Sequence, residues 1–244
     1  MSERFFSSEP ITAERVTLGG AEAHHLLHVM RAAVGESVTL FDDSGAEFTA
    51  VIEKSGRSQV EVRIITRHEI NRELPFQVIV AVAIPKGERQ KWLVEKLTEL
   101  GVATLVPLVT RRGVAQPTGS ALERFGRTVI EAAKQCGRNR LMRIAEPQTW
   151  SAWVSSADGN RDSPERRLVA HPGGMPLPQI DLSAPLATRL AIGPEGGLAD
   201  EEIAAATAEG WQLVDLGPRI LRVETATIAL SAAVALLNPA LSPP

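Results

Sequence analysis

The chain has 244 residues, of which 44% are hydrophobic and 23% charged, and its formal net charge at pH 7 is −3. These values are ordinary for a globular protein and leave room for one large domain or two small ones. The negative charge excludes a protein that binds nucleic acid by being basic throughout. The single cysteine, Cys136, excludes an internal disulfide framework and a cysteine-rich zinc site. Because neither a secretory signal pattern nor an apolar run of about 18 residues is visible, we expect a cytoplasmic protein.

The first 70 residues have the pattern of antiparallel β structure. Residues 58–66 alternate between apolar and polar side chains, which is typical of a strand with one face in water. Residues 37–53 are predicted to form two strands joined by an Asp-Asp-Ser-Gly turn. Residues 21–32 place apolar side chains at helical spacing. We therefore predict a small barrel or curled sheet with one helix.

From about residue 75, apolar strands alternate with helices, which predicts a parallel sheet with helices on both faces. Residues 76–84 are apolar on both faces, as in a central parallel strand, and the helix at 88–101 is expected to end at Gly101. The polar stretch 68–76 separates the two patterns, so we place domains at 1–72 and 73–244. The further predicted elements are strand 104–109, helix 120–136, strand 166–170, a surface loop at 172–178, strand 188–192, helix 200–209, strand 211–216 and helix 224–237.

One segment departs from the overall acidity. Residues 111–143 contain eight Arg or Lys but only two acids, Glu123 and Glu131. Such a local excess of positive charge is either a footprint for a phosphate backbone or a solvated helix face.

The stretch "LAIGPEGGLADEEI" (190–203) reads as a strand, a glycine-rich turn and a helix. Its G-x-x-G-G spacing matches neither the dinucleotide fingerprint nor the P-loop. Pro194 removes a backbone donor and Glu195 would repel a phosphate. Such a turn at a strand's carboxyl end is either a plain strand–helix connection or a binding loop for a nucleoside without phosphates.

A second glycine-containing turn lies in "LGPRILRVETATIAL" (216–230), which also follows a predicted strand. Arg219 and Arg222 precede a helix whose first turn contains Glu224 and Thr225. That helix is rich in alanine, which suits a tight core or a subunit interface. The two turns could line one pocket, since the carboxyl ends of parallel strands share one edge of a sheet.

Two other groups of residues have less specific patterns. Cys136 has no histidine in its segment and is more typical of a buried free thiol than of a nucleophile. His24, His25 and His28 have helical spacing but no acidic or cysteine partners nearby, so a polar or RNA-facing helix surface is favoured over a zinc site. His171 follows the strand at 166–170, where it could form a pocket wall.

Taken together, "IGPEGGLADEEI" and "LGPRILRVETATIAL" resemble the SPOUT class of RNA methyltransferases, and within it the 16S ribosomal RNA uracil-N3 methyltransferase family. Supporting matches are "HHLLHVMR" (24–31), "KGERQKWLVEKLTELGV" (86–102), "EAAKQCGR" (131–138) and His171. The sequence departs from the family pattern at Lys134, Met142 and Ala199.

The resemblance implies a PUA-like β-barrel that helps to hold RNA, followed by a SPOUT-type α/β domain with a C-terminal trefoil knot. It implies S-adenosylmethionine as cofactor, no metal, a homodimer, and as substrate one uridine of 16S rRNA in the assembled 30S subunit. The residues implied to bind the cofactor are His171, Ile192, Gly193, Pro194, Glu195, Gly196, Gly197, Leu216, Gly217, Ile220, Leu221, Arg222, Thr225 and Ala226. Those implied to bind RNA are Arg31, Lys86, Arg111, Arg112, Gln135 and Arg138.

The resemblance also suggests how the reaction is catalysed. Uracil N3 carries a proton at neutral pH, so a base must take it and the developing anion must be stabilised. We expect Arg222 to stabilise the anion and Glu224 to act as base or orienting group. Two alternatives stay open, namely a methyltransferase of the same fold that acts on another base or a ribose 2′-OH, and an RNA-binding ribosome factor without activity.

Overall fold

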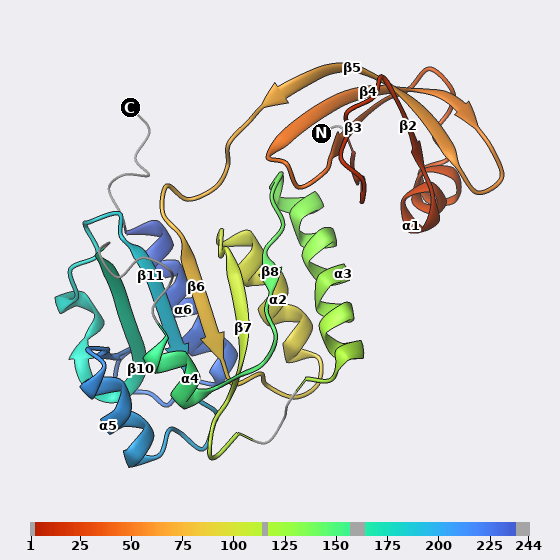
Figure 1. The fold of residues 1–244 in the computed structure, drawn as a ribbon. Coiled ribbons are helices and arrows are strands. Elements are labelled where there is room, and N and C mark those ends of the chain that lie inside the picture. Colours follow the sequence, from red (N-terminus) through yellow and green to blue (C-terminus); the bar gives the residue numbers. More distant parts are fainter. Residues whose placement is uncertain (1–2, 114–116, 157–163, 238–244) are drawn as a thin grey trace. The chain divides into compact units, whose positions relative to one another are not determined.

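The computed structural model describes residues 3–113, 117–156 and 164–237. It divides into two compact units (Figure 1), the first comprising residues 1–73 and 130–141 and the second comprising residues 74–129 and 142–244. The long helix α3 (Gly119–Cys136) contributes to both units. The domain boundary between residues 72 and 73 stays a prediction, as does the trefoil knot.

The first unit contains the predicted small sheet. Its strand order is β1-β3-β4-β5-β2, in which β1 pairs parallel with β3 and every other pair is antiparallel. Side chains along β4 alternate between buried and half-buried over eight residues, because successive side chains of a strand point to opposite faces. The strands are β1 (Arg4–Phe6), β2 (Arg15–Leu18), β3 (Ser37–Phe41), β4 (Ala46–Ser55) and β5 (Val60–Glu69).

The helix predicted over 21–32 is shorter and less regular than expected. Helix α1 (Gly20–His24) passes directly into a π-helix (His25–Met30). The helix ends because Arg31 takes the left-handed conformation, with φ 57°, and the N–H of Ala32 bonds back to the carbonyl of Leu26 at 3.0 Å. Apolar spacing alone does not distinguish this wider turn from an α-helix.

The second unit is built on a parallel sheet, as predicted. The strand order is β12-β10-β11-β6-β7-β8, and β9 also pairs with β7. Every pair in this sheet is parallel. The strands are β6 (Val78–Val82), β7 (Thr104–Val109), β8 (Arg143–Ile144), β9 (Gln148–Thr149), β10 (Glu165–Pro176), β11 (Ala187–Ile192) and β12 (Gln212–Asp215).

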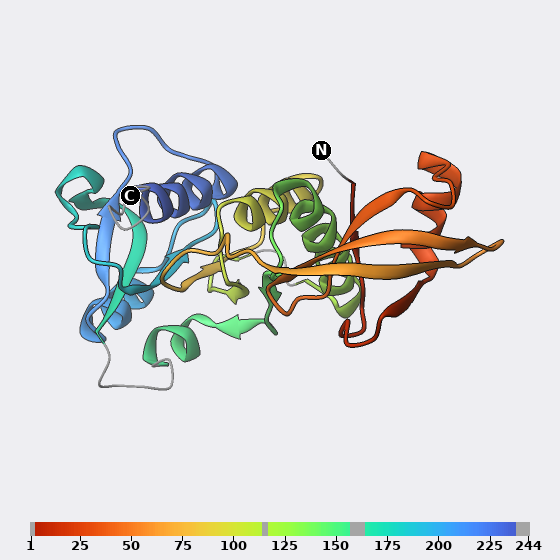
Figure 2. The ribbon, with the colours of Figure 1, turned by 90° about the horizontal axis from the view of Figure 1, so that it is seen from above.

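Helices cover both faces of this sheet. Helices α2 (Arg89–Glu99) and α6 (Val223–Leu236) lie together on one face, and α4 (Trp150–Ser155) and α5 (Asp200–Ala208) lie on the other (Figure 2). Gly101 ends α2 as predicted: it has φ +79°, and the next N–H, of Val102, bonds to the carbonyl of Leu97 at 3.1 Å. None of the helices in the described ranges is long and apolar enough to cross a lipid bilayer.

The loop predicted at 172–178 is wrong, because β10 continues to Pro176 and a short 3-10 helix follows (Leu177–Gln179). Ala170 and Met175 both pair with Val214 of β12, so the four residues between them form a bulge in the strand. The bulge begins with His171, at the end of β10's pairing with β11. It therefore sets the position of a predicted site residue.

Candidate functional site

A pocket lies where three neighbouring strands of the second unit reach the same edge of the sheet. Ala170 of β10 pairs with Ile192 of β11 and with Val214 of β12, so these three residues form one row across the sheet. All three line the pocket, together with the chain that follows each of them. The carboxyl end of a parallel sheet is where α/β proteins bind their ligands.

The turn after β11 is tight and fixed by its own backbone. The N–H of Gly197 bonds to the carbonyl of Pro194 at 2.8 Å, and Gly197 has φ +72°. A Cβ atom at Gly193 would lie 2.8 Å from the side chain of Leu198, so glycine is needed for this packing. Arg112 braces the turn from outside, since its Nη1 donates to the carbonyl of Gly196 at 3.0 Å.

The acids that follow this turn stabilise the start of α5. One oxygen of Glu202 accepts the N–H of Ala199 at 2.8 Å, and the other accepts the N–H of Arg111 at 2.8 Å. A hydrogen bond from its own backbone and the side chain of Arg111 lower the pKa of Glu201. Glu201 and Glu202 of the predicted acidic first turn therefore accept hydrogen bonds from the protein itself. Their negative charge also complements the helix dipole.

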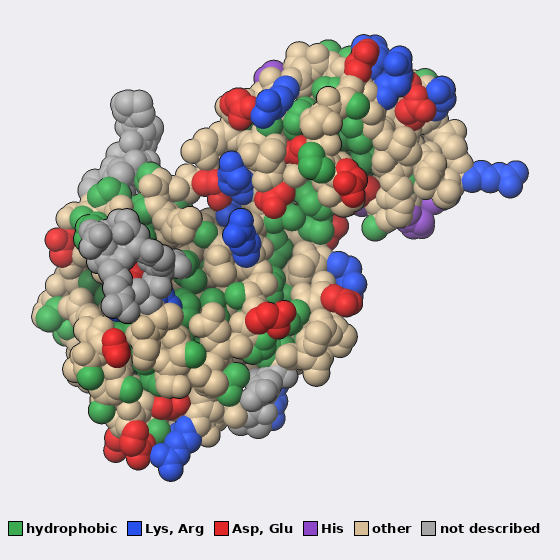
Figure 3. Space-filling view, in the orientation of Figure 1, with side chains coloured by type: hydrophobic (Ala, Val, Ile, Leu, Met, Phe, Trp, Pro, Cys, Tyr) green, Lys and Arg blue, Asp and Glu red, His purple; other side chains and the backbone are tan. Residues whose placement is uncertain are grey.

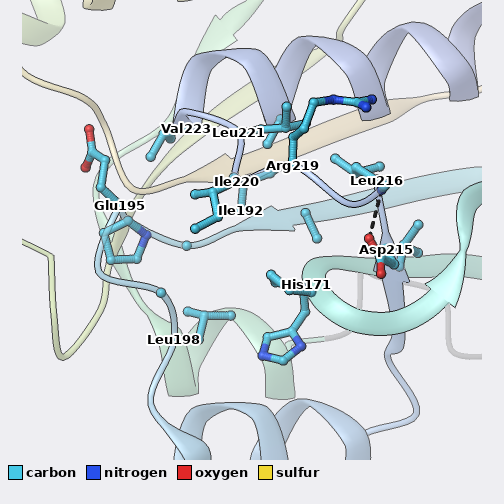
Figure 4. Close-up of a pocket in the computed structure, with 18 residues that line it drawn as sticks. His171, Ile192, Glu195, Leu198, Asp215, Leu216, Arg219, Ile220, Leu221 and Val223 are labelled. Atoms are coloured by element: carbon cyan, nitrogen blue, oxygen red, sulfur yellow. Dashed lines mark hydrogen bonds between the residues drawn. The ribbon is translucent and has the colours of Figure 1, made fainter.

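The turn after β12 forms the opposite wall of the pocket (Figure 4). The carboxylate of Asp215 accepts the N–H of Gly217 at 2.8 Å, and Gly217 has φ +107°. Ile220 and Leu221 then line the pocket before α6 begins. In Figure 4 the carboxylate of Glu195 lies at the rim of the pocket and points away from its centre.

Most of the residues predicted to bind the cofactor line this pocket. Gly196, Arg222 and Thr225 do not, although Arg222 and Thr225 line an adjacent groove. The predicted residues in the pocket wall are His171, Ile192, Gly193, Pro194, Glu195, Gly197, Leu216, Gly217, Ile220, Leu221 and Ala226. The sequence reasoning missed Ala170, Pro172, Leu198, Val214, Asp215, Arg219 and Val223.

The two predicted catalytic residues lie in the adjacent groove, at the start of α6. Arg222 is exposed and precedes the helix in an extended conformation, with φ −66° and ψ 155°. Glu224 stands in the first turn of the helix, is 5% exposed, and has a buried Oε2 that no described residue meets with a hydrogen bond. The groove also contains Glu88, Arg89 and Trp92 from the start of α2.

The residues predicted to bind RNA differ in how accessible they are. Arg31, Lys86 and Gln135 are exposed. Arg111 and Arg112 are also exposed but bond to the α5 start and to the turn after β11. Arg138 is only 4% exposed and its guanidinium forms an ion pair with Glu73 at 2.5 Å. Much of the positive excess at 111–143 is thus matched by acids and carbonyls.

Mixed charge is also visible on the molecular surface. On the face drawn in Figure 3, Lys and Arg side chains lie among Asp and Glu side chains. Lys134, a departure from the family pattern, has a side chain that is 8% exposed and pairs with Glu22 at 3.1 Å. This lysine therefore contributes to the packing of the first unit.

The histidine cluster and the cysteine have ordinary local contacts. The rings of His24 and His28 lie 4.9 Å apart, and His25 Nε2 lies 3.4 Å from a carboxylate oxygen of Glu3. Within the ranges that the structure describes, no three His, Cys, Asp or Glu side chains are grouped as metal ligands would be. Cys136 is half-buried, with its Sγ 3.9 Å from the carbonyl of Ala133.

Comparison with known proteins places this architecture in a family. Residues 72–235 match the RNA methyltransferase domain family, and residues 18–65 match the RNA methyltransferase PUA domain family. Ribosomal RNA small subunit methyltransferase E of Synechocystis is 38% identical over 94% of this chain and 76% of its own length. The protein of the same name from Bacillus subtilis is 30% identical over 90% of each chain.

Solved structures agree over nearly the full length. Ribosomal RNA small subunit methyltransferase E of Neisseria gonorrhoeae, bound to S-adenosylmethionine, has a TM-score of 0.89 and 27% identity, covering 99% of this chain and 100% of its own. A Legionella pneumophila structure described as a methyltransferase with bound cofactor SAM has a TM-score of 0.88 and 33% identity, covering 98% of both chains. The chain therefore belongs to the ribosomal RNA small subunit methyltransferase E family of RNA methyltransferases.

Proposed function

We propose that this chain transfers a methyl group from S-adenosylmethionine to N3 of one uridine in the 16S rRNA of the small ribosomal subunit. The observation that carries the proposal is the pocket at the ends of β10, β11 and β12, with its two glycine-containing turns. The relatives named above and the two structures with bound S-adenosylmethionine support it. We further propose that it works as a homodimer, in the cytoplasm, on assembled 30S subunits.

The residues of the pocket fit this cofactor. Its walls are largely apolar, which suits an adenine ring and the methylene groups of the methionine part, and backbone groups at the strand ends can pair with the polar atoms. His171 has a buried Nδ1 that no described residue meets with a hydrogen bond, so a ligand atom could be its partner. The acids Glu195 and Asp215 in the wall tolerate a sulfonium cation and disfavour a phosphate.

We assign the binding of the cofactor to both turns and to the start of α6. Gly193 and Gly217 allow the backbone to approach a ligand closely. Gly196 is assigned to hold the first turn in shape, since its carbonyl is tied to Arg112. Arg222 and Thr225 would contact the cofactor from the adjacent groove, which they line together with Leu221.

The bound cofactor supplies an electrophilic methyl group: the N3–methyl bond forms as the methyl–sulfur bond breaks, and S-adenosylhomocysteine leaves. This chain's residues must hold the uracil in line and manage one proton. We propose that Arg222 donates hydrogen bonds to a uracil carbonyl oxygen and so stabilises the anion that forms when N3 loses its proton. Glu224 is proposed to accept that proton or to orient the base, because its buried carboxylate and Arg222 line the same groove.

RNA binding is proposed to involve both parts of the chain. The PUA-like part, residues 1–72, would hold RNA through exposed Arg31, and the methyltransferase part, residues 73–244, through Lys86, Arg111, Arg112 and Gln135. Arg138 would contribute mainly by fixing the chain after α3 through its ion pair with Glu73. The target uridine must be unpaired, because N3 lies on the base's pairing edge.

Mapping rRNA modifications by mass spectrometry in a strain without this gene tests the proposed activity. We expect one 16S uridine to lose its N3 methyl group and to regain it when the purified protein and S-adenosylmethionine are added to isolated small subunits. Loss of a methyl group from another base or a ribose would favour a different activity of the same fold. Calorimetry that detects no binding of S-adenosylmethionine would favour an RNA-binding factor.

The role of Arg222 is tested separately. We expect Arg222→Ala to lower kcat by about 100-fold or more, since an electrostatic partner of the developing anion is lost. The affinity for S-adenosylmethionine, measured by calorimetry, should fall by a much smaller factor, because Arg222 would contact the cofactor only from the adjacent groove. Full activity of the variant with unchanged cofactor binding would show that Arg222 is not the stabilising group.

A further inference from the structure

A second concave surface adjoins the cofactor pocket and has a chemistry of its own. We call it the acceptor groove, and it is formed by the starts of the neighbouring helices α2 and α6. Ile220 and Leu221 line both the groove and the pocket, so the two share a wall. The groove residues are Glu88, Arg89, Trp92, Ile220, Leu221, Arg222, Glu224 and Thr225.

The groove contains a buried acceptor without a donor. The side chain of Glu224 is 7% exposed, and its Oε2 receives no hydrogen bond from any described residue. The nearest cation is Arg89, whose Nη1 lies 3.6 Å from Oε2, beyond hydrogen-bond distance. An unsatisfied carboxylate oxygen in a buried position is unfavourable, and a ligand N–H in the groove would satisfy it.

Arg89 connects this carboxylate to the cofactor pocket. The same Nη1 atom lies 3.4 Å from Oε1 of Glu195, which belongs to the turn after β11. One guanidinium therefore lies between a carboxylate of the pocket wall and a carboxylate of the groove. Loss of this guanidinium would leave Glu224 buried without its nearest positive charge.

The remaining walls of the groove offer flat and apolar surface. Trp92 is 44% exposed although tryptophan is a large apolar side chain, and Ile220 is 96% exposed. An exposed indole is a platform on which an unstacked base can lie. The groove thus combines a stacking surface with one buried carboxylate, Glu224, and two arginines, Arg89 and Arg222.

We propose that the acceptor groove is the subsite for the uracil base, and that Arg89 is a positioning residue that holds Glu224 and Glu195 for the reaction. This inference rests on the proposed function. Uracil presents one N–H between two carbonyl oxygens, and the groove contains one acceptor without a donor, Glu224 Oε2, together with the guanidinium donors of Arg89 and Arg222. Cytosine has no N3–H in its neutral form, so the same groove rejects it by leaving Glu224 unsatisfied.

The test compares variants on small subunits from the strain that lacks the gene. Arg89→Met should lower kcat by about 100-fold, because misplacement of reacting groups by about 1 Å has effects of that size. Arg89→Lys, which keeps the charge, should restore part of this loss. Trp92→Ala should mainly raise the KM for subunits. S-adenosylmethionine affinity should stay close to that of the wild type for all three variants.

Lys91→Met is the matched control, because Lys91 lies on the same helix but pairs with Glu95 outside the groove. It should retain the wild-type kcat and KM. Thermal melting of each variant shows whether it is folded, and Trp92→Ala and Arg89→Lys carry the test if Arg89→Met does not fold.

Three results would overturn the inference. One is a wild-type kcat for Arg89→Met, and another is equal loss in Arg89→Lys and Arg89→Met. The third is a Trp92→Ala protein that loses activity together with its oligomeric state, measured by light scattering, since a second copy of the chain would then cover the groove. If the wild-type protein methylates no uridine on these subunits, the proposed function itself fails, which is a distinct result.

Discussion

At Gly174, strand β10 passes so close to β12 that a side chain has no room. A Cβ atom there would lie 2.5 Å from the carbonyl carbon of Leu213 and 2.7 Å from the backbone nitrogen of Val214. Both neighbours are backbone atoms and cannot rotate away. Gly174 also closes the bulge that begins with His171, so this close approach shapes one edge of the cofactor pocket.

We therefore expect Gly174→Ala to lower the free energy of unfolding by about 1–3 kcal/mol, as overpacking does elsewhere. Gly126→Ala is the control, because Gly126 lies within α3 and an added Cβ there meets no heavy atom within 4 Å. That change should be neutral or stabilise the protein by up to about 1 kcal/mol. Urea unfolding followed by circular dichroism measures both, and equal stability of the two variants would contradict the argument.

At the scale of the elements, the start of α5 is joined to two loops by one side chain. Glu202 accepts the backbone N–H of Ala199 ahead of the helix and that of Arg111 after β7, both at 2.8 Å. Ala199 has no side-chain acceptor, so Glu202 carries the capping of this turn.

We expect Glu202→Ala to destabilise the protein by about 1–3 kcal/mol, because it leaves two backbone donors without their charged acceptor. Glu201→Ala is the matched control: its side chain is exposed and its ion pair with Arg111 lies at the surface, so its loss should change the stability little. Hydrogen exchange should report faster opening around residues 193–203 for Glu202→Ala alone. Similar exchange in both variants would show that the cap does not depend on Glu202.

Strong apolar periodicity made most of these elements predictable, while short or irregular ones were missed. Strand β6 and helix α2 lie within the predicted ranges 76–84 and 88–101. The short helix α4 was missed because the six residues "WSAWVS" make fewer than two turns, too few to show a helical period. Thr149 caps this helix by accepting the N–H of Ala152 at 3.3 Å. The extension of β10 was missed because Gly173-Gly174 resembles a loop, whereas it allows close approach of two strands.

Residues of the candidate site could be predicted from the sequence where they directly follow a predicted strand. His171, the turn 193–197 apart from Gly196, and four residues of the second turn were found in this way and line one pocket; the four are Leu216, Gly217, Ile220 and Leu221. Asp215 and Val214 were missed because they are the last residues of a strand, and only the register across β10 shows that they face the ligand position. Arg89 was missed because its two carboxylate partners are more than 100 residues away in the chain.

At the scale of the whole molecule, acid should weaken the first unit through one carboxylate, Glu47. Glu47 accepts hydrogen bonds from Arg4 and from Arg72. Burial alone would raise the pKa of Glu47, but these two arginines outweigh it and hold the pKa below the ordinary value of 4.5. A lowered folded-state pKa means that the stabilisation is complete above the unfolded-state pKa and is lost as the pH falls through the folded-state pKa.

We expect the free energy of unfolding to fall as the pH drops below about 4.5, and to fall less steeply for Glu47→Gln. At pH 7 the substitution should cost about 1–3 kcal/mol, since it removes a charged acceptor from two arginines. Urea unfolding between pH 3 and 7 measures both effects, with exposed Glu36→Gln as the control. The same pH dependence in Glu47→Gln and the wild type would assign the acid sensitivity to other carboxylates.

The last prediction concerns residues 130–141, which belong to the first unit although the chain before and after them belongs to the second. Residues 130–141 follow most of α3 in the chain but make their contacts with the first unit: Lys134 pairs with Glu22 at 3.1 Å, and Asn139 Nδ2 donates to the carbonyl of Ile70 at 3.1 Å. A chain of residues 73–244 lacks both partners, and buried Lys134 would lose Glu22 and keep Glu131, whose side chain is largely exposed. We expect hydrogen exchange to show that residues 130–141 lose protection in this shortened chain. Calorimetry should still detect S-adenosylmethionine binding, because every residue lining the pocket belongs to the second unit. Retained protection at 130–141 would show that this segment folds without the first unit, and loss of cofactor binding would show that the pocket depends on it.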